Sequence, residues 1–351
     1  MQEIRLGIIG FGGMGKNHAK NAPKAGVEVV AAADILPERV QEAKDAGLTA
    51  YGSADELLAD ERVNTVILTV PNHLHKEMAI KAAKAGKNVI AEKPAALNVR
   101  ELDEMTAACQ EAGVHFTVHQ NRRWDRDMLT VKYAYDHNLL GNIFTIESKL
   151  HSGNGYMHEW HLYKKYGGGM MYDWGVHLID QILFMMPGVK VKTIFADLKS
   201  VLHDEVDDYF KIIMKMSNGI TVHIELSTYI LKYQPRWLAA GDKGTMVVDS
   251  LGGRTGAIYR TGKLLEKLPI EIAESEIGPT RQFAPVPPGG ITEEPLPQIE
   301  TDVSEFYRNF RDVLNGTAEQ KIKISEVRRV LAVMEAVVQS SETNQAIQFE
   351  T

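Results

Sequence analysis

A glycine-rich turn near the N-terminus constrains the fold of this 351-residue chain more than any other feature. The segment "IRLGIIGFGGMG" places the pattern Gly10-x-Gly12-x-x-Gly15 between an apolar run at 4–10 and a helical pattern. Gly10 allows a tight turn, Gly12 lets the backbone approach a pyrophosphate, and Gly15 permits close packing of the helix on the strand. The N-terminus of that helix offers amide donors and a positive dipole end to phosphates. The turn therefore predicts a dinucleotide-binding unit.

The first 120 residues alternate short apolar runs with amphipathic helical patterns, which is typical of a parallel, doubly wound sheet. The apolar runs are nearly continuous, so we expect strands that are buried on both faces. The expected strands are 4–10, 27–34, 63–70, 87–93 and 114–118. The expected helices are 37–47, 75–87 and 98–113, each with glycine near its C-terminal end.

Asp34 ends the second expected strand, 19 residues after Gly15, where such folds bind the adenosine ribose. A carboxylate there accepts hydrogen bonds from the ribose hydroxyls and repels the 2′-phosphate of NADP. Ile35 offers no compensating charge, so the sequence favours NAD. A side chain of Arg39 that swings back would tolerate NADP. The other cofactor contacts expected in the turn are Phe11, Gly13 and Met14.

The pattern changes after residue 124, so we expect a first domain at 1–124 and a second domain at 125–351. In the second domain the expected strands are one at 142–152, a hairpin at 207–229 with an Asn-Gly turn, and a hairpin at 236–250. The expected helices there are 128–141, 301–316 and 325–342. Residues 270–298, rich in Pro, Gly and Glu, predict a long irregular loop. These elements predict an α+β domain with an antiparallel sheet.

Composition excludes several classes of protein. The net charge is −7, which speaks against nucleic acid as a partner. The single cysteine, Cys109, cannot form an internal disulfide. No apolar run approaches the roughly 20 residues that a membrane helix needs, and the N-terminal residues lack the features of a signal peptide. We therefore expect a cytoplasmic protein with no membrane contact.

The segment "GGGMMYDWGVHLID" (167–180) sets Asp173 and His177 four positions apart in an otherwise apolar helical stretch. On a helix, residues four apart project from the same face. Burial of a carboxylate and an imidazole costs free energy unless the groups are paired or used. The pair is therefore a candidate for chemistry.

Together with the glycine turn and "AEKPAAL" (91–97), this segment resembles the Gfo/Idh/MocA oxidoreductases, which include inositol dehydrogenases and several sugar dehydrogenases. The resemblance covers nearly the whole chain. It implies an N-terminal Rossmann domain, a second domain with a large open, mostly antiparallel sheet, and a homodimer or homotetramer formed through that sheet. It also implies that Lys93, Asp173 and His177 are catalytic. The last expected helix resembles the family's C-terminal helix, which would pack back on the Rossmann domain.

The residue types suit the oxidation of a secondary alcohol, which needs a base for the hydroxyl proton while hydride leaves to the nicotinamide. His177 is the better base, because its ordinary pKa of about 6.5 is near working pH. Asp173 could orient His177 or bond a substrate hydroxyl. Lys93 ends the expected strand 87–93, at the edge where such sheets bind ligands, and could stabilise an alkoxide. The alternatives are a helix cap for Asp173, a core histidine and a solvated lysine.

Further contacts are expected around this centre. Residues at or after the ends of the expected strands 63–70 and 87–93 should border the nicotinamide ribose, namely Val70, Pro71, Asn72, His75 and Glu92. The resemblance places Asn121 and Arg122 near cofactor or substrate, although an interdomain salt bridge suits Arg122 and Arg123 equally well. Trp160 could stack on a sugar ring while His158 or His161 binds hydroxyls; packing of this segment on the next helix is the alternative.

The set His158, His161, Asp173 and His177 also suits a divalent metal. Typical members of the family need no metal, so none is expected.

Three functions fit the sequence. The leading one is an NAD(H)-dependent oxidoreductase that acts on a secondary hydroxyl of a sugar, polyol or glycoside, such as the 3-hydroxyl of a glucoside. The second is a glycoside hydrolase or lyase that oxidises its substrate transiently with bound NAD. The third is a non-catalytic NAD-binding regulator, which would not need Lys93, Asp173 and His177 together.

Overall fold

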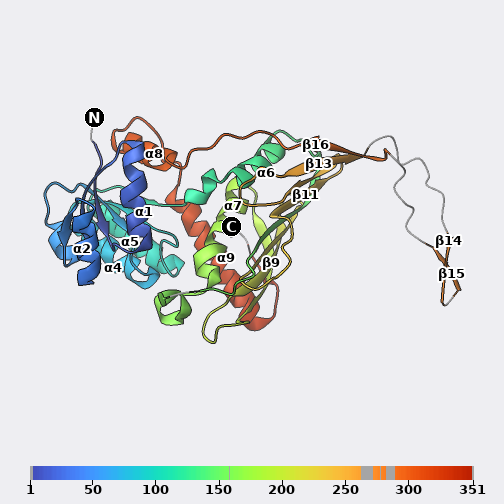
Figure 1. The fold of residues 1–351 in the computed structure, drawn as a ribbon, viewed down its shortest axis with the longest axis horizontal. Coiled ribbons are helices and arrows are strands. Elements are labelled where there is room, and N and C mark those ends of the chain that lie inside the picture. The colour runs from blue at the N-terminus through green and yellow to red at the C-terminus, as the bar shows by residue number, and fades with distance from the viewer. Residues whose placement is uncertain (1–2, 158, 262–271, 277, 282–288, 350–351) are drawn as a thin grey trace.

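The computed structural model describes residues 3–157, 159–261, 272–276, 278–281 and 289–349. Two sheets lie at opposite ends of an elongated molecule, with long helices between them (Figure 1). The expected α/β class, with a Rossmann-type sheet and a second, mostly antiparallel sheet, is confirmed.

The first sheet has six parallel strands in the order β3-β2-β1-β4-β5-β6. Its strands are β1 (Arg5–Ile9), β2 (Glu28–Ala33), β3 (Thr49–Tyr51), β4 (Thr65–Leu68), β5 (Asn88–Ala91) and β6 (Phe116–Val118). Its helices are α1 (Gly13–Asn21), α2 (Pro37–Asp45), α3 (Ala54–Leu58), α4 (His75–Lys84) and α5 (Val99–Glu111). Every residue of β4 and β5 is buried, as the continuous apolar runs predicted.

The second sheet has nine strands in the order β16-β13-β12-β11-β7-β10-β9-β8-β17. They are β7 (Ile143–His151), β8 (Val191–Lys199), β9 (Tyr209–Met216), β10 (Thr221–Ser227), β11 (Trp237–Gly241), β12 (Gly244–Val248), β13 (Gly256–Thr261), β16 (Ile291–Pro295) and β17 (Ile347–Gln348). All neighbours are antiparallel except β7 and β10. Both expected hairpins are present, as β9–β10 and β11–β12.

The expected irregular loop at 270–298 is wrong in its described part. It contains β16, which pairs with β13, and the small hairpin of β14 (Ile272–Ser275) and β15 (Gly278–Arg281), which lies far from the body in Figure 1. Charged and proline residues are common on edge strands, so the composition of β16 concealed its structure. The rest of the predicted loop lies outside the described residues.

Four helices follow the first sheet in the chain. They are α6 (Arg126–Asp136), α7 (Val176–Met185), α8 (Glu305–Leu314) and α9 (Ile324–Thr343). Helix α8 lies near α1 and contacts the short turn Ala22–Ala25 (Figure 1). Helix α9 contacts β8 and α7 as well as α5 and β6, so it joins the two halves. The domain boundary at 124 and 125 stays a prediction.

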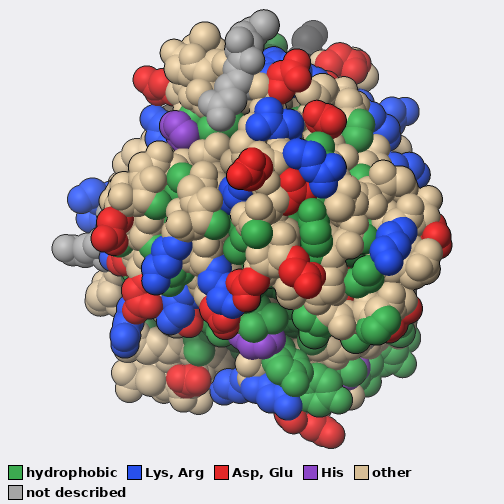
Figure 2. Space-filling model, turned by 90° about the vertical axis from the view of Figure 1, so that its left-hand side faces the viewer, with side chains coloured by type: hydrophobic (Ala, Val, Ile, Leu, Met, Phe, Trp, Pro, Cys, Tyr) green, Lys and Arg blue, Asp and Glu red, His purple; other side chains and the backbone are tan. Residues whose placement is uncertain are grey.

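Figure 2 shows the end of the molecule that holds the first sheet. Acidic and basic side chains are interspersed on this face, and apolar side chains gather toward its lower edge. Within the described ranges, no helix combines the length and apolar character needed to cross a bilayer.

Candidate active site

Lys93 and Asp173 meet where the first sheet faces the start of α7. Lys93 is the second residue after β5, at the carboxyl edge of the sheet. Its Nζ atom donates to Asp173 Oδ1 over 2.7 Å and to the Asp173 backbone carbonyl over 2.8 Å. The two side chains are 17% and 24% exposed, so the pair is partly shielded yet within reach of a ligand.

Asp173 lies in a π-helical turn, Met171–Gly175, which runs directly into α7. Turns of this kind are rare and occur frequently at functional sites. The turn is held from outside by Asp207, whose carboxylate accepts from Met171 N over 2.7 Å and whose carbonyl accepts from Met170 N over 2.8 Å. Asp207 was not predicted, because it precedes β9 and gives no local signal of this contact.

His177 occupies the second position of α7 and is 3% exposed. Its Nδ1 atom is buried and has no hydrogen-bond partner within the described residues. Burial, and after it the charges of Lys93 and Arg122, lower the pKa of His177 well below its ordinary value. The imidazole is therefore neutral near pH 7 and can accept a proton. The Asp173 carboxylate accepts from Lys93 through Oδ1, and the orientation of His177 by Asp173 stays a prediction.

The Asp173 carboxylate is charged. Burial raises the pKa of this carboxyl, but the ammonium of Lys93 outweighs burial and holds the pKa below its ordinary value. The charge of Lys93 also contributes to the lowered pKa of His177, so a positive charge, a negative charge and a neutral imidazole lie in one region. Such a set can polarise a hydroxyl and take its proton.

The glycine turn is packed so closely that a side chain at Gly10 or Gly15 would clash with backbone, which is the close packing that a dinucleotide-binding turn requires. Gly10 has φ +96°, and a Cβ added there would lie 2.8 Å from the Thr69 carbonyl oxygen. A Cβ on Gly15 would lie 2.2 Å from the Gly10 carbonyl oxygen. Helix α1 begins at Gly13, so its first amides face the turn. Met14 is 41% exposed, whereas Phe11 is buried.

Asp34 holds the backbone of this turn through its side-chain carboxylate. Its carboxylate accepts from Phe11 N over 2.7 Å and from Leu36 N over 3.0 Å, and it is 8% exposed. The guanidinium of Arg39 approaches the same carboxylate to 3.8 Å and lies beside Gly12. A cation therefore lies beside the carboxylate that follows β2. Ile35 is exposed.

The residues after β4 brace the site. His75 is buried at the start of α4, and solvent does not surround it. Its Nδ1 lies 2.9 Å from the Pro94 carbonyl and its Nε2 lies 3.0 Å from the Val70 carbonyl. Asn72 follows Pro71 and donates from Nδ2 to the Gly167 carbonyl over 2.8 Å. These contacts connect the carboxyl ends of β4 and β5 with the segment before the π-helical turn.

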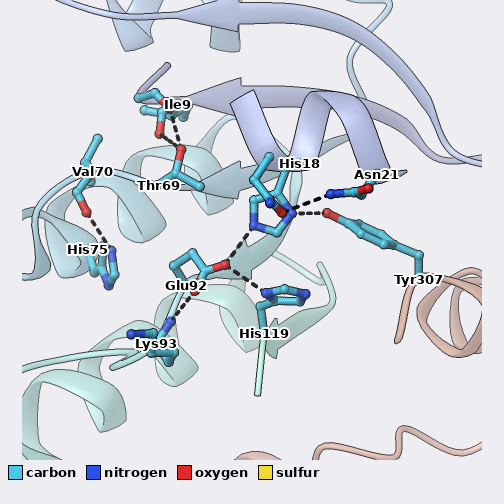
Figure 3. A network of polar contacts seen from close by, with 12 residues as sticks. Ile9, His18, Asn21, Thr69, Val70, His75, Glu92, Lys93, His119 and Tyr307 are labelled. Atoms are coloured by element: carbon cyan, nitrogen blue, oxygen red, sulfur yellow. Dashed lines mark hydrogen bonds and ion pairs between the residues drawn. The ribbon is translucent and has the colours of Figure 1, made fainter. Parts of the chain in front are cut away.

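Glu92 lies beside Lys93, but its carboxylate faces inward. Oε1 lies 2.7 Å from His18 Nε2 and 2.8 Å from His119 Nδ1, while Oε2 accepts from Lys93 N over 3.0 Å (Figure 3). Sequence reasoning missed both histidines. A signal was present for His18, a polar residue three positions after Gly15 on a helix that packs on the sheet.

The two arginines after β6 have different partners. Arg123 pairs with Asp180 of α7 at 2.6 Å and with Glu326 of α9 at 2.6 Å, which is the expected interdomain salt bridge. The guanidinium of Arg122 lies 4.1 Å from the centre of the Trp174 ring and pairs locally with Asp125. Asn121 begins the short helical turn Asn121–Trp124 and is half-buried.

Trp160 and His161 lie in the turn Glu159–Leu162, with their rings stacked at 3.8 Å. The charge of His161 lowers the pKa of Asp173, which places it near the site. His158 lies outside the described residues. Within the part of the chain that is described, His18, Glu92 and His119 form a grouping with metal-ligand residue types. The alternative metal set considered from the sequence includes His158 and is therefore not tested.

Comparisons with known proteins agree with this geometry. Residues 4–120 match the oxidoreductase family with an NAD-binding Rossmann fold, and residues 128–247 match the GFO/IDH/MocA C-terminal domain. The chain therefore belongs to the Gfo/Idh/MocA oxidoreductase family, with an NAD-binding Rossmann domain.

The chain is similar to three known proteins that illustrate this family. A solved structure of an NAD-binding protein from Listeria innocua is 38% identical, covers 99% of this chain and 100% of that chain, and has a TM-score of 0.93. The scyllo-inositol 2-dehydrogenase (NADP(+)) IolW of Bacillus subtilis is 26% identical, over 99% of this chain and 96% of its own length. The myo-inositol 2-dehydrogenase of Thermotoga maritima is 28% identical, over 71% and 76%.

Proposed function

We propose that the protein is an NAD(H)-dependent dehydrogenase of a secondary hydroxyl in a sugar, polyol or glycoside. The observation that carries the proposal is the Lys93–Asp173 ion pair beside a buried, neutral His177. This arrangement combines a cation for a developing alkoxide with a proton acceptor, which is what alcohol oxidation needs.

In this proposal His177 accepts the hydroxyl proton through a ring nitrogen, because burial keeps its imidazole neutral. Lys93 stabilises the negative charge that develops on the oxygen, and Asp173 holds the ammonium in place. Nicotinamide, when bound, supplies the hydride acceptor. Arg122, fixed over Trp174, lines the same region and contributes positive charge.

The proposed substrate class rests on two supports. Two relatives are named as inositol 2-dehydrogenases, and inositols are ring polyols. In addition, the stacked rings of Trp160 and His161 offer an aromatic surface and a polar atom of the kind that binds a pyranose or cyclitol. The 3-hydroxyl of a glucoside is the most specific candidate.

We propose NAD as the preferred cofactor, because the carboxylate of Asp34 lies at the end of β2. Arg39 makes NADP binding plausible in chemical terms, and one relative's name specifies NADP(+). Asn121 and the residues after β4 stay proposed cofactor contacts. A homodimer or homotetramer through the second sheet stays a proposal, as does a cytoplasmic location.

The test is a panel of sugars, inositols and glycosides with NAD, followed by the absorbance of NADH. The proposal expects NADH formation with at least one ring polyol or glycoside. A chromogenic glycoside measured in parallel distinguishes the alternative mechanism, because transient oxidation releases the aglycone without net NADH. Binding of NAD with no turnover of any panel member, and no aglycone release, would favour a regulator.

A further inference from the structure

Four buried side chains next to the proposed catalytic lysine form a connected unit that the reaction itself does not use. We call it the Glu92 cluster (Figure 3). Its members come from α1, from the ends of β5 and β6, and from α8, and none is more than 7% exposed. They are His18, Glu92, His119 and Tyr307.

The polar atoms at the centre of the cluster are matched in donor and acceptor. Burial raises the pKa of Glu92, but His119 and His18 hold it well below its ordinary value, so Glu92 is charged. A charged carboxylate only accepts, so His18 Nε2 and His119 Nδ1 both carry hydrogen. Burial lowers the pKa of His18, so its Nδ1 is a free acceptor for the Tyr307 hydroxyl, 2.6 Å away.

The distances exclude a metal-centred geometry for the cluster as it stands. The Glu92 oxygen lies 2.7 Å and 2.8 Å from the two ring nitrogens, which is hydrogen-bond separation. Two ligands held about 2.0–2.1 Å from tetrahedral zinc would lie roughly 3.3 Å apart. The unit is therefore a hydrogen-bond network.

The network ends on the backbone of Lys93. The second Glu92 oxygen, Oε2, accepts from Lys93 N over 3.0 Å, and the Lys93 side chain reaches Asp173 on the other side. A carboxylate that three donors hold from two sides cannot rotate without losing charge-assisted bonds. The orientation of Lys93 is thereby tied to Tyr307 of α8, a helix that follows β16 in the chain.

We propose that His18, His119 and Tyr307 are positioning residues, which act through Glu92 to hold Lys93 in register with Asp173. The inference rests on the proposed function of Lys93. It assigns Glu92 an internal role in place of the ribose contact expected from sequence, since both of its oxygens are already engaged.

The first test compares Tyr307→Phe with Phe310→Leu. The former removes one hydroxyl and keeps the ring, whereas the latter alters another buried residue of α8. We expect Tyr307→Phe to lower kcat roughly 10-fold, with the NAD Kd unchanged. Phe310→Leu should lower thermal stability while kcat is retained. The readouts are kcat at saturating NAD and the best panel substrate, NAD affinity by calorimetry, and the melting temperature.

The second test uses the donor at His119. Asn places an N–H near the position of Nδ1, whereas Leu has no donor, so His119→Asn should keep most of the kcat that His119→Leu loses. A purely structural role would not give this rescue at equal melting temperatures. The proposal is overturned if Tyr307→Phe and His119→Leu keep wild-type kcat. It is equally overturned if NAD affinity falls by the same factor as kcat, because the cluster would then serve the cofactor. Full activity of Lys93→Ala would instead reject the proposed function.

Discussion

Lys93 and Asp173 lie 80 residues apart in the chain, yet the lysine ammonium contacts both the carboxylate and the backbone carbonyl of the aspartate. The contact joins the carboxyl edge of the parallel sheet to the turn that begins α7. Because this edge is where doubly wound sheets bind their ligands, the ion pair lies where we propose that cofactor and substrate meet.

The glycine turn gives a prediction with an internal control. A Cβ at Gly15 would lie 2.2 Å from the Gly10 carbonyl oxygen, whereas one at Gly13 meets nothing within 4 Å. Gly15→Ala should therefore lower the free energy of unfolding by about 1–3 kcal/mol and weaken NAD binding strongly. Gly13→Ala should change the unfolding free energy by less than about 0.5 kcal/mol. Urea unfolding checks both, and equal effects would contradict the tight packing at Gly15.

Cofactor choice should depend on Arg39. Its guanidinium lies 3.8 Å from the Asp34 carboxylate and beside Gly12, where it can pair with a 2′-phosphate. We expect Arg39→Ala to raise the KM for NADP about 10-fold or more while the KM for NAD changes little. Kinetics with both cofactors test this. Equal losses for both would mean that Arg39 supports the turn and does not read the phosphate.

His177 should make the folded state sensitive to acid. Its pKa is lowered in the folded protein, so below pH about 6.5 the unfolded chain binds more protons than the folded one. The free energy of unfolding must then decrease as pH falls through that range. Buried His18 and His75, whose pKa values are also lowered, act in the same direction.

Replacement of His177 by Asn should make this pH dependence shallower by up to about 1.4 kcal/mol per pH unit. Urea unfolding at pH 7.5 and 5.5 measures it. The exposed His137, replaced in the same way, is the control and should leave the slope unchanged. Identical slopes for wild type and His177→Asn would show that His177 is protonated equally in both states.

Asp207 should act in the opposite sense. Burial raises the pKa of its carboxyl to about 7, so between about pH 4 and 7 the folded state binds a proton that the unfolded chain lacks. Stability attributable to this group is therefore lost as pH rises through that window. Asp207→Asn keeps an acceptor for Met171 N, so above pH 7 it should exceed the wild type by up to about 4 kcal/mol.

At pH 4 the two proteins should be equally stable. Asp208→Asn is the matched control, because Asp208 accepts two backbone N–H bonds, from Val201 and Leu202, each over 2.7 Å. Loss of one ionic acceptor there should destabilise the protein. An Asp207→Asn variant that is less stable than the wild type at pH 8 would contradict the raised pKa.

The sequence predicts local structure well and long-range partners poorly. The five expected strands of the first sheet are confirmed, because continuous apolar runs between glycine-terminated helices carry a local pattern. The three-residue β3 was missed, since so short a strand has no periodicity. Strand β8 was missed although its inward residues alternate, and β16 was concealed by charge and proline.

For the candidate site, residue types and motif spacing suggested Lys93, Asp173 and His177, but not how they pair. A helical reading sets Asp173 beside His177, while the π-helical turn directs the carboxylate to Lys93. The contacts of Glu92 with His18 and His119 span 74 and 27 residues. No local sequence pattern predicts such contacts, because they depend on how strands and helices that are distant in the chain are arranged in the folded protein.

The most direct test of the account is the rate of NADH formation by Lys93→Ala with the best hydroxyl substrate, measured beside the NAD dissociation constant. The exposed Lys84→Ala is the control for loss of a lysine. The account predicts that Lys93→Ala loses at least about 100-fold in kcat, with NAD still bound at near wild-type affinity and Lys84→Ala fully active. Turnover of Lys93→Ala equal to that of the wild type would contradict the account.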